Sequence, residues 1–417
     1  MRIEQSLPYL ERSIPTSQAE HKISPIADAL DSSLRIHIRE PQGLGRSVFE
    51  AICSNGEQIT YGCGKGSDSR IGAFGECLEH LHIWLSAQHG SGMNLPVPVE
   101  EIYTSDAFMG VGSRFMSANE SVLATPFVRF GSRSTEHIFV PSALVNVFLQ
   151  IDERPVSQSD VFFRRYASSS GTAFGFSFQD AMLHASLEII ERDEISKLFI
   201  SLVGLEDEQL SYELISNYSF NAEVEEAVER LRQKLRGVGL ITCLRKTSYG
   251  AYFSFSKMTF QHEGQEYVVW GAGCSLYRDL AIYRSVTECE QMADGDLGAF
   301  SERLRLFTQK YSRLRCIYDL NLSKLQLTPV TLEKELSVKK TTDSQLELLS
   351  QSINSSGREI LFCAYEPIVP SYSVVTAYIT DTEKFFNVKH GLPALPISHL
   401  RKYDPRYCAD RSTLCEI

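Results

Sequence analysis

Three segments far apart in the chain end in the same arrangement of oxygen-bearing side chains. In each segment two oxygen-bearing residues stand three positions apart. Small or variable residues precede them at offsets of three, four and seven positions. Offsets of this kind fall on one face of an α-helix. The fold must therefore hold three helices of this pattern, expected at about residues 69–87, 178–199 and 279–292. The pairs are Glu76 with Glu79, Glu188 with Glu191, and Glu288 with Gln291.

Each of these helices follows a segment of small residues, and two of the segments follow a strand–turn–strand pattern. Asn55-Gly56 is a strong signal for a β-hairpin turn. We expect a repeated hairpin–loop–helix unit, which indicates a mixed α/β fold with antiparallel sheets. The expected strands are residues 47–53 and 58–61 in one unit and 252–260 and 267–270 in the other, and the expected loops are Gly62–Ser67, Ser168–Gly175 and Gly271–Ser275.

The order of these elements predicts three parts of the chain. We predict N-terminal strands and a hairpin in residues 1–60, a core with the three helices in 61–320, and a C-terminal part in 321–417 that completes the same domain. Within this division, residues 321–355 are polar and are interpreted as a peripheral insertion. Further elements are expected as a charged helix at 222–236 and strands at 240–245, 359–365 and 373–379.

Composition narrows the class of protein. Hydrophobic residues make up 43% of the 417 residues, which is enough for a sizeable core, and the net charge of −11 argues against non-specific binding of nucleic acid. The N-terminal residues lack the apolar stretch of a signal peptide, and no apolar run is long enough to span a membrane. The ten cysteines show no C-x-x-C pair or zinc spacing. We therefore expect free thiols and a cytoplasmic location.

Carboxylates on an apolar helix indicate a bound cation. A single Glu pair at this spacing is common on a solvated helix face and would be uninformative alone. In the second helix, however, Leu187, Ile189 and Ile190 surround Glu188 and Glu191 and leave little room for a solvated face. Converging carboxylates need a compensating charge. Mg²⁺ prefers oxygen ligands and usually shares them with phosphates and water.

Several other residues fit a nucleotide. Lys65, in a loop that lacks the order of a Walker A motif, could contact a phosphate as a point charge. Arg284 could pair with Glu288 on its own helix or neutralise a transferring phosphoryl group. His184 could be a packed neutral histidine or a functional one, and Gln291 can form hydrogen bonds without contributing charge. Arg192 and Asp193 are expected to form structural ion pairs.

The combined motifs resemble the YcaO family. The resemblance extends from Gly64-Lys65-Gly66 to Arg284-Ser285-Val286-Thr287-Glu288-Cys289-Glu290-Gln291, and Glu188-Ile189-Ile190-Glu191-Arg192-Asp193 is its most specific part. It implies a YcaO-like fold with Mg–ATP among the three helices. It implies Mg²⁺ contacts from Glu76, Glu79, Glu188, Glu191 and Glu288, nucleotide contacts from these and from Lys65, His184, Arg284 and Gln291, and catalytic roles for Arg284 and Glu288.

The implied activity is ATP-dependent activation of a peptide-backbone amide. In azoline-forming members, a Cys, Ser or Thr side chain of a ribosomally made precursor peptide attacks the preceding carbonyl, and loss of water gives a thiazoline or oxazoline. The resemblance also implies a ThiF-like leader-binding subunit and a flavin-dependent dehydrogenase as partners, and a homodimer within a hetero-oligomer.

Departures from the family pattern keep other reactions open. Gly72 stands where the family often has Ser, and His80 where it often has Arg. The C-terminal residues Thr413–Ile417 do not form the Pro-x-Pro-x-Pro tail of many azoline-forming members. The alternatives are thioamide or amidine formation, or a non-catalytic nucleotide-binding scaffold.

Overall fold

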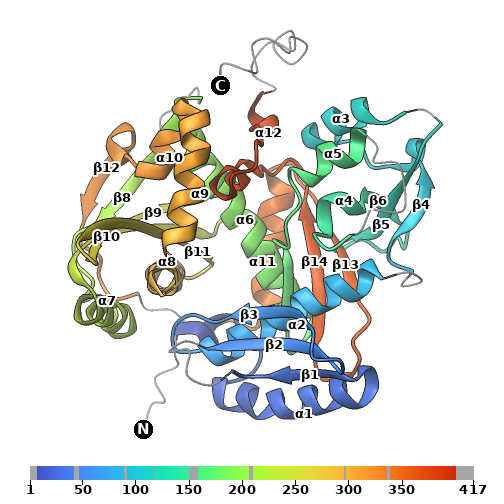
Figure 1. Ribbon diagram of the computed structural model, residues 1–417, viewed down its shortest axis with the longest axis horizontal. Helices are drawn as coiled ribbons and strands as arrows, with labels where there is room; N and C mark the ends of the chain where they lie inside the picture. Colours follow the sequence, from blue (N-terminus) through green and yellow to red (C-terminus); the bar gives the residue numbers. More distant parts are fainter. Residues whose placement is uncertain are drawn as a thin grey trace. The chain divides into compact units, whose positions relative to one another are not determined.

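The computed structural model divides the chain into two compact units (Figure 1). The first comprises Met1–Ile189, Ser248–Gly250 and Ser337–Thr380, and the second comprises Ile190–Thr247, Ala251–Leu336 and Asp381–Ile417. The structure describes residues 7–41, 47–88, 92–117, 119–149, 158–205, 210–294, 297–335 and 339–400.

The N-terminal part of the first unit is a three-stranded antiparallel sheet with two helices. Its strands are β1 (Ile36–Arg39), β2 (Val48–Cys53) and β3 (Gln58–Cys63), in that spatial order. The predicted Asn55-Gly56 turn joins β2 to β3, and Gly56 has a φ of +85°, which glycine adopts without strain. Helices α1 (Thr16–Leu34) and α2 (Ser69–Ala87) share one hydrophobic core with the sheet, which includes Ile23, Phe49, Phe74 and Leu78.

A second sheet of the first unit joins strands from both ends of the chain. Its order is β4-β5-β13-β14-β7, with β6 paired to β5. Short helices on this unit are η1 (Leu7–Glu11), η2 (Val99–Glu101), α3 (Ala107–Gly112), η3 (Ser113–Phe115), α4 (Ser142–Val145), α5 (Gln158–Arg164) and the longer α11 (Thr342–Ser355). The strands are β4 (Leu95–Pro98), β5 (Ser121–Arg129), β6 (Ile138–Pro141), β7 (Thr172–Gly175), β13 (Ile360–Tyr365) and β14 (Ser373–Ile379).

The second unit contains a five-stranded sheet in the order β11-β10-β9-β8-β12, in which only the β8–β12 pair is parallel. Its strands are β8 (Ser211–Ile215), β9 (Arg236–Lys246), β10 (Tyr252–His262), β11 (Gln265–Ser275) and β12 (Gln326–Val330). Its helices are α7 (Ala222–Lys234), α8 (Arg278–Ala293), α9 (Leu297–Lys310), η4 (Ser312–Leu314), α10 (Arg315–Asp319), η5 (Leu322–Lys324), η6 (Phe385–His390) and α12 (Ile397–Leu400). Helix α6 (Phe178–Val203) contributes residues to both units.

The expected repeat is present, because β2–β3–α2 in the first unit and β10–β11–α8 in the second follow the same order of elements (Figure 1). The mixed α/β fold class with antiparallel sheets is therefore confirmed. Helix α2 has the predicted bounds, and α6 and α8 lie within a few residues of theirs.

The predicted small-residue loops are partly wrong. Residues 172–175 form β7, residues 271–275 complete β11, and residues 62–63 end β3. The small residues serve close helix–strand packing rather than flexibility. A Cβ atom at Gly271 would lie 2.3 Å from the carbonyl oxygen of Ser285 and 2.7 Å from the Cβ of Glu288, so α8 can pack this closely only over glycine.

The interpretation of residues 321–355 as a peripheral insertion is also wrong. Strand β12 is part of the five-stranded sheet, and α11 buries Leu346, Leu349 and Ile353 almost completely. The polar residues that suggested an insertion occupy the outer face of an amphipathic helix. The division at residues 60 and 320 stays a prediction, and the tail Thr413–Ile417 lies outside the described residues.

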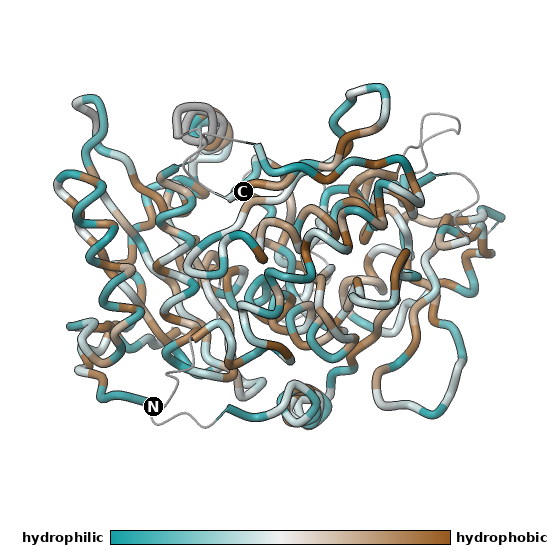
Figure 2. The backbone as a smooth tube through the Cα atoms, turned by 90° about the horizontal axis from the view of Figure 1, so that it is seen from below, coloured by the Kyte–Doolittle hydropathy of each residue, from teal (hydrophilic) through white to brown (hydrophobic). Residues whose placement is uncertain are grey.

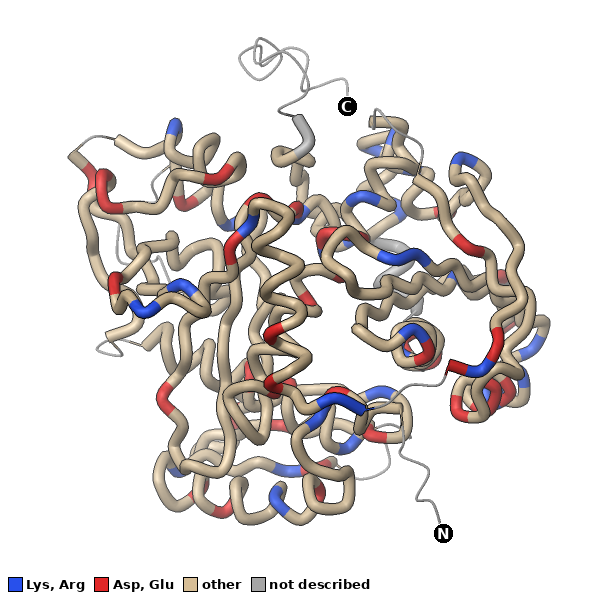
Figure 3. Tube along the Cα trace, turned by 180° about the vertical axis from the view of Figure 1, so that it is seen from behind, with Lys and Arg blue, Asp and Glu red and all other residues tan. Residues whose placement is uncertain are grey.

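Hydropathy and charge both vary over short distances along the chain (Figure 2, Figure 3). Teal and brown alternate along the helices in Figure 2, and none of the described helices is long and apolar enough to cross a membrane. Lys and Arg are interspersed with Asp and Glu along the chain in Figure 3. The described cysteines are all free, as expected from their spacing.

Candidate functional site

The first carboxylate of the predicted site is fixed by the strand beside it. Glu76 lies on α2, which follows β3 directly and packs on it. The backbone N–H of Cys63, the last residue of β3, donates a hydrogen bond of 2.7 Å to Glu76 Oε2. A charge-assisted bond of this kind holds the carboxylate in one orientation.

Glu79 is held in the same manner by a different strand. It lies one turn after Glu76 on α2, and the N–H of Phe174 in β7 donates to Glu79 Oε1 at 2.7 Å. Phe174 and Phe74 pack edge to face with their ring centroids 5.9 Å apart, so apolar contact joins the same helix to the same strand. The Glu79 carboxylate thus lies where α2 packs on β7, in surroundings that are otherwise apolar.

Glu188 on α6 is the third carboxylate of the first unit. The N–H of Gly171 donates to Glu188 Oε2 at 3.0 Å. Gly171 has a φ of +89°, and a Cβ atom there would lie 2.5 Å from Ile189 Cδ1, so only glycine can present this N–H. Three helix carboxylates in the first unit therefore each accept a backbone N–H from a neighbouring segment.

The three carboxylates act on one another electrostatically. Burial raises the pKa of the Glu76 carboxyl, and the charge of Glu188 raises it further, whereas the Cys63 N–H, His80 and Lys65 lower it. Burial also holds the pKa of Glu79 well above its usual range, with Glu188 and Glu76 adding to the rise. The sequence-predicted residues Lys65, Glu76, Glu79 and Glu188 are therefore brought into one field within the first unit.

This environment fits a hydrated divalent cation with a phosphate ligand. Buried carboxylates that repel one another take up protons unless a cation compensates them. The donors are hard carboxylate oxygens, as Mg²⁺ prefers. Among the described residues no group of three or more His, Cys, Asp or Glu is arranged to hold a metal ion by itself. Mg²⁺ bound through one or two carboxylates, with phosphate oxygens and water completing its shell, fits these residues.

Of the other predicted residues, those on α8 lie in the second unit and His184 lies in the first. On α8, the guanidinium Nη1 of Arg284 donates to the carbonyl oxygen of Cys274 in β11 at 2.7 Å. Glu288 lies on the same helix over Gly271, and Gln291 follows it one turn later, half-buried. His184 is half-buried on the part of α6 that belongs to the first unit.

The residues after the second Glu pair form ion pairs, as predicted. Arg192 Nη1 lies 2.5 Å from Glu191 Oε1, and its guanidinium lies over the ring of Phe386. Asp193 Oδ2 pairs with Lys197 Nζ at 2.7 Å, and Asp193 Oδ1 accepts a hydrogen bond from the N–H of Glu383. Glu191 is therefore held by an arginine, whereas the three carboxylates of the first unit are held by backbone N–H groups.

Sequence reasoning missed the backbone donors. The small-residue segments next to each helix carry the signal, but their composition is typical of loops. The N–H groups of Cys63, Gly171 and Phe174 lie in or beside strands, and it is this regular geometry that aims them at the carboxylates.

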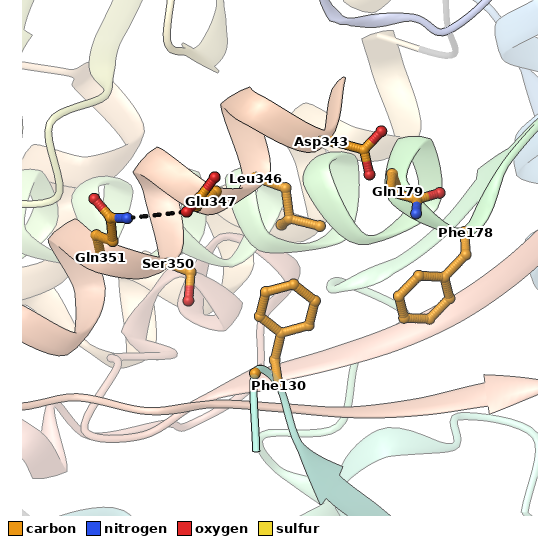
Figure 4. A pocket seen from close by; sticks show the side chains of 9 residues that line it. Phe130, Phe178, Gln179, Asp343, Leu346, Glu347, Ser350 and Gln351 are labelled. Atoms are coloured by element: carbon orange, nitrogen blue, oxygen red, sulfur yellow. Dashed lines mark hydrogen bonds between the residues drawn. The ribbon is translucent and has the colours of Figure 1, made fainter. Parts of the chain in front are cut away.

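A separate groove of about 270 Å³ lies on the first unit, at the first residues of α6 (Figure 4). Phe130 and Phe178 line it from one side, and Asp343 and Glu347 of α11 lie along its other side. None of the predicted site residues lines this groove.

Comparison with known proteins identifies the family. A family model described as "YcaO cyclodehydratase, ATP-ad Mg2+-binding" matches residues 62–382, which is about three quarters of the chain. The predicted cofactors, ATP and Mg²⁺, are thus confirmed at the level of the family. A comparison with curated proteins gives no match.

Solved structures share the fold. YcaO from Methanopyrus kandleri, bound with AMPPCP and Mg²⁺, has a TM-score of 0.62 at 15% identity, over 92% of this chain and 96% of that one. A heterocyclase in complex with substrate and cofactor has a TM-score of 0.63 at 14% identity, over 90% of this chain and 54% of that one, so this chain spans about half its length. A chain of the E. coli microcin synthetase McbBCD complex has a TM-score of 0.51 at 14% identity, over 82% and 86%.

The matched residues 62–382 include all three helices with paired oxygen-bearing side chains and all the backbone donors that hold Glu76, Glu79 and Glu188. The chain belongs to the YcaO family of ATP- and Mg²⁺-binding cyclodehydratases.

Proposed function

We propose that this chain uses Mg–ATP to activate backbone amides of a ribosomally made precursor peptide and cyclodehydrates Cys, Ser or Thr residues to thiazoline or oxazoline. The observation that carries the proposal is the set of three carboxylates, Glu76, Glu79 and Glu188, that the first unit assembles from two helices. They repel one another, and each is oriented by a backbone N–H.

Within this proposal, the carboxylates of the first unit bind Mg²⁺, and Lys65 contacts a phosphate oxygen. Bound Mg–ATP supplies the phosphoryl group that makes the amide oxygen a leaving group. The backbone N–H groups keep the carboxylates in place before the nucleotide binds, so little reorganisation is needed.

The roles of the remaining residues rest on the sequence resemblance and stay predictions. They are Mg²⁺ binding by Glu191 and Glu288, nucleotide contacts by His184 and Gln291, and stabilisation of phosphoryl charge by Arg284. Arg284 is suited to this role because a guanidinium presents several donors in a fixed plane. We propose that the protein acts by positioning and charge stabilisation, without a covalent nucleophile of its own.

The proposed substrate and partners follow the same logic. The structures of similar fold include a heterocyclase in complex with substrate and a synthetase complex of several subunits. These support a precursor peptide as the substrate and a hetero-oligomer as the working form. A ThiF-like leader-binding subunit and a flavin-dependent dehydrogenase are the proposed partners, with a homodimer of this chain inside the complex.

The test is a reaction of the chain and its partner subunit with the precursor peptide, ATP and Mg²⁺, analysed by mass spectrometry. The proposal predicts one water lost per ring and one phosphate released per ring. Exchange of oxygen for sulfur would identify thioamide formation instead. An amidine formed with an amine of the peptide also loses one water, so fragment ions that place this loss away from Cys, Ser and Thr would identify that alternative.

Glu188→Gln separates an enzyme from a scaffold. Under the proposal the variant makes no product, because a site carboxylate is neutral, while it still binds the partner. Product formed at the wild-type rate by a complex that contains Glu188→Gln would show that this chain is a scaffold and would refute the catalytic role.

A further inference from the structure

A short N-terminal segment contacts both helices that carry the carboxylates of the first unit. The segment Arg12–Thr16 lies between η1 and the first turn of α1. It lies outside residues 62–382, the part of the chain that the family model matches. Its contacts are therefore a property of this chain that the family match does not describe.

The first contact is made at the start of α2. Arg12 Nη1 lies 2.8 Å from Asp68 Oδ2, and the Thr16 hydroxyl donates to Asp68 Oδ1 at 3.1 Å. Asp68 occupies the N-cap position of α2, where an aspartate usually accepts an N–H of the first helical turn. Its side chain makes no such capping bond here. The Asp68 carboxylate instead contacts Arg12 and Thr16 of the N-terminal segment.

The second contact is made at the start of α6. The backbone N–H of Ser13 donates to Asp180 Oδ1 at 2.9 Å, and the Ser13 hydroxyl donates to Asp180 Oδ2 at 2.5 Å. Asp180 is 2% exposed and Asp68 is 6% exposed, so both carboxylates are shielded from water. Neighbouring residues of one segment thus hold the first turns of two different helices.

The segment itself is anchored on both sides. After it, Ala19 and Ile23 of α1 are almost fully buried in the core of the first unit. Before it, Gln345 donates to the carbonyl oxygen of Leu10 at 2.7 Å, and at its first residue Lys339 donates to the carbonyl oxygen of Arg12 at 2.7 Å. Because the segment is fixed on both sides, it can hold the two helices in place instead of moving with them.

The two contacts stand at matching places relative to the site. Asp68 precedes Glu76 by eight residues, and Asp180 precedes Glu188 by eight residues. At 1.5 Å per residue, each carboxylate lies about 12 Å along its helix from the contact. Asp68 also ends the short segment that carries Lys65. Displacing one contact would therefore shift one carboxylate relative to the other.

We propose that Arg12, Ser13 and Thr16 form a strap that holds the first turns of α2 and α6 in register and so positions Glu76, Glu188 and Lys65 for Mg–ATP. The inference rests on the proposed function for its ligand, and its structural part stands on the contacts alone. A misplacement of about 1 Å in such a site can cost on the order of 10²-fold in rate.

The test uses the double variant Ser13→Ala with Thr16→Val. It removes two hydroxyl contacts but leaves the Arg12–Asp68 ion pair, so no buried charge loses its partner and the chain is expected to fold. The matched control is Ser17→Ala, because Ser17 is exposed next to Thr16 and its hydroxyl makes no hydrogen bond in the described part of the chain. Ser13→Thr, which keeps a hydroxyl, is the rescue variant.

Three readouts are compared: amide hydrogen exchange of residues 64–69, calorimetric binding of AMPPCP with Mg²⁺, and the melting temperature. The strap predicts exchange several-fold faster at residues 64–69 and binding about tenfold weaker in the double variant, with Ser17→Ala and Ser13→Thr close to wild type. A lower melting temperature with unchanged local exchange and affinity would overturn it. If the wild-type chain binds no AMPPCP, the proposed function fails, and the exchange comparison still decides whether the strap exists.

Discussion

Replacing Glu79 by glutamine should stabilise the ligand-free protein while impairing its nucleotide site. Burial holds the pKa of the Glu79 carboxyl well above its ordinary value of 4.5, and the charges of Glu188 and Glu76 act in the same direction. A glutamine resembles the protonated acid, since its carbonyl can accept the Phe174 N–H and its amide group can donate. The substitution therefore removes the cost of taking up a proton on folding and keeps the hydrogen bond.

The sign and size of the effect follow from proton linkage. Between pH 4.5 and the raised pKa, Glu79 holds a proton in the folded chain and loses it in the unfolded chain. The free energy of unfolding of the wild type therefore falls as the pH rises through this range, by up to about 1.4 kcal/mol per pH unit. Glu79→Gln lacks this proton, so its advantage over the wild type should be small at pH 5 and grow toward pH 8.

Urea unfolding at a series of pH values measures this difference, with Mg²⁺ and nucleotide absent. Glu57→Gln, at an exposed position in the β2–β3 turn, is the matched control and should follow the wild type. A gain of 1 kcal/mol corresponds to roughly 2–4 °C in melting temperature for a unit of this size. Curves for Glu79→Gln and the wild type that stay parallel from pH 5 to pH 8 would refute the claim that Glu79 is protonated by its burial.

Three further predictions concern the same cluster. Binding of Mg²⁺ with AMPPCP should release protons at a pH between 4.5 and the raised pKa values of Glu76 and Glu79, because these pKa values must fall when a cation binds. Calorimetry in buffers of different ionisation enthalpy measures this release. Lys65→Met should weaken AMPPCP binding about tenfold with little change in melting temperature, since a charge-assisted phosphate contact contributes roughly 1.5–3 kcal/mol. Gly171→Ala should lower stability by about 2 kcal/mol or more in urea unfolding, because of its positive φ and its contact with Ile189.

The local elements were predictable because their signals are short-range. The Asn55-Gly56 turn and the apolar periodicity of residues 69–87 fix β2, β3 and α2 without reference to the rest of the chain. The carboxylate pairs were found in the same manner, since a helical face can be identified from spacing alone. The part of the site that depends only on residues within one helix was therefore available from the sequence.

Contacts between distant segments were not predictable. Nothing in the spacing of Arg12, Ser13, Asp68 and Asp180 indicates that they meet, because 52 residues separate Thr16 from Asp68 and 167 separate Ser13 from Asp180. The two compact units also draw on interleaved parts of the chain. The strands β13 and β14 of the first unit, for example, come from the C-terminal third of the chain.

The association of small residues with site carboxylates has one physical cause. A carboxylate on a helix face that packs against a strand is removed from water and needs a donor, and the nearest donors are the N–H groups of that strand. Side chains on the strand would keep the helix too far away, so the strand must offer glycine or another small residue where the two meet. Gly171 donates such an N–H to Glu188, and Gly271 beneath Glu288 allows the same close approach in the other unit. The repeated sequence pattern therefore reflects a packing requirement first, and the capacity to hold a cation follows from it.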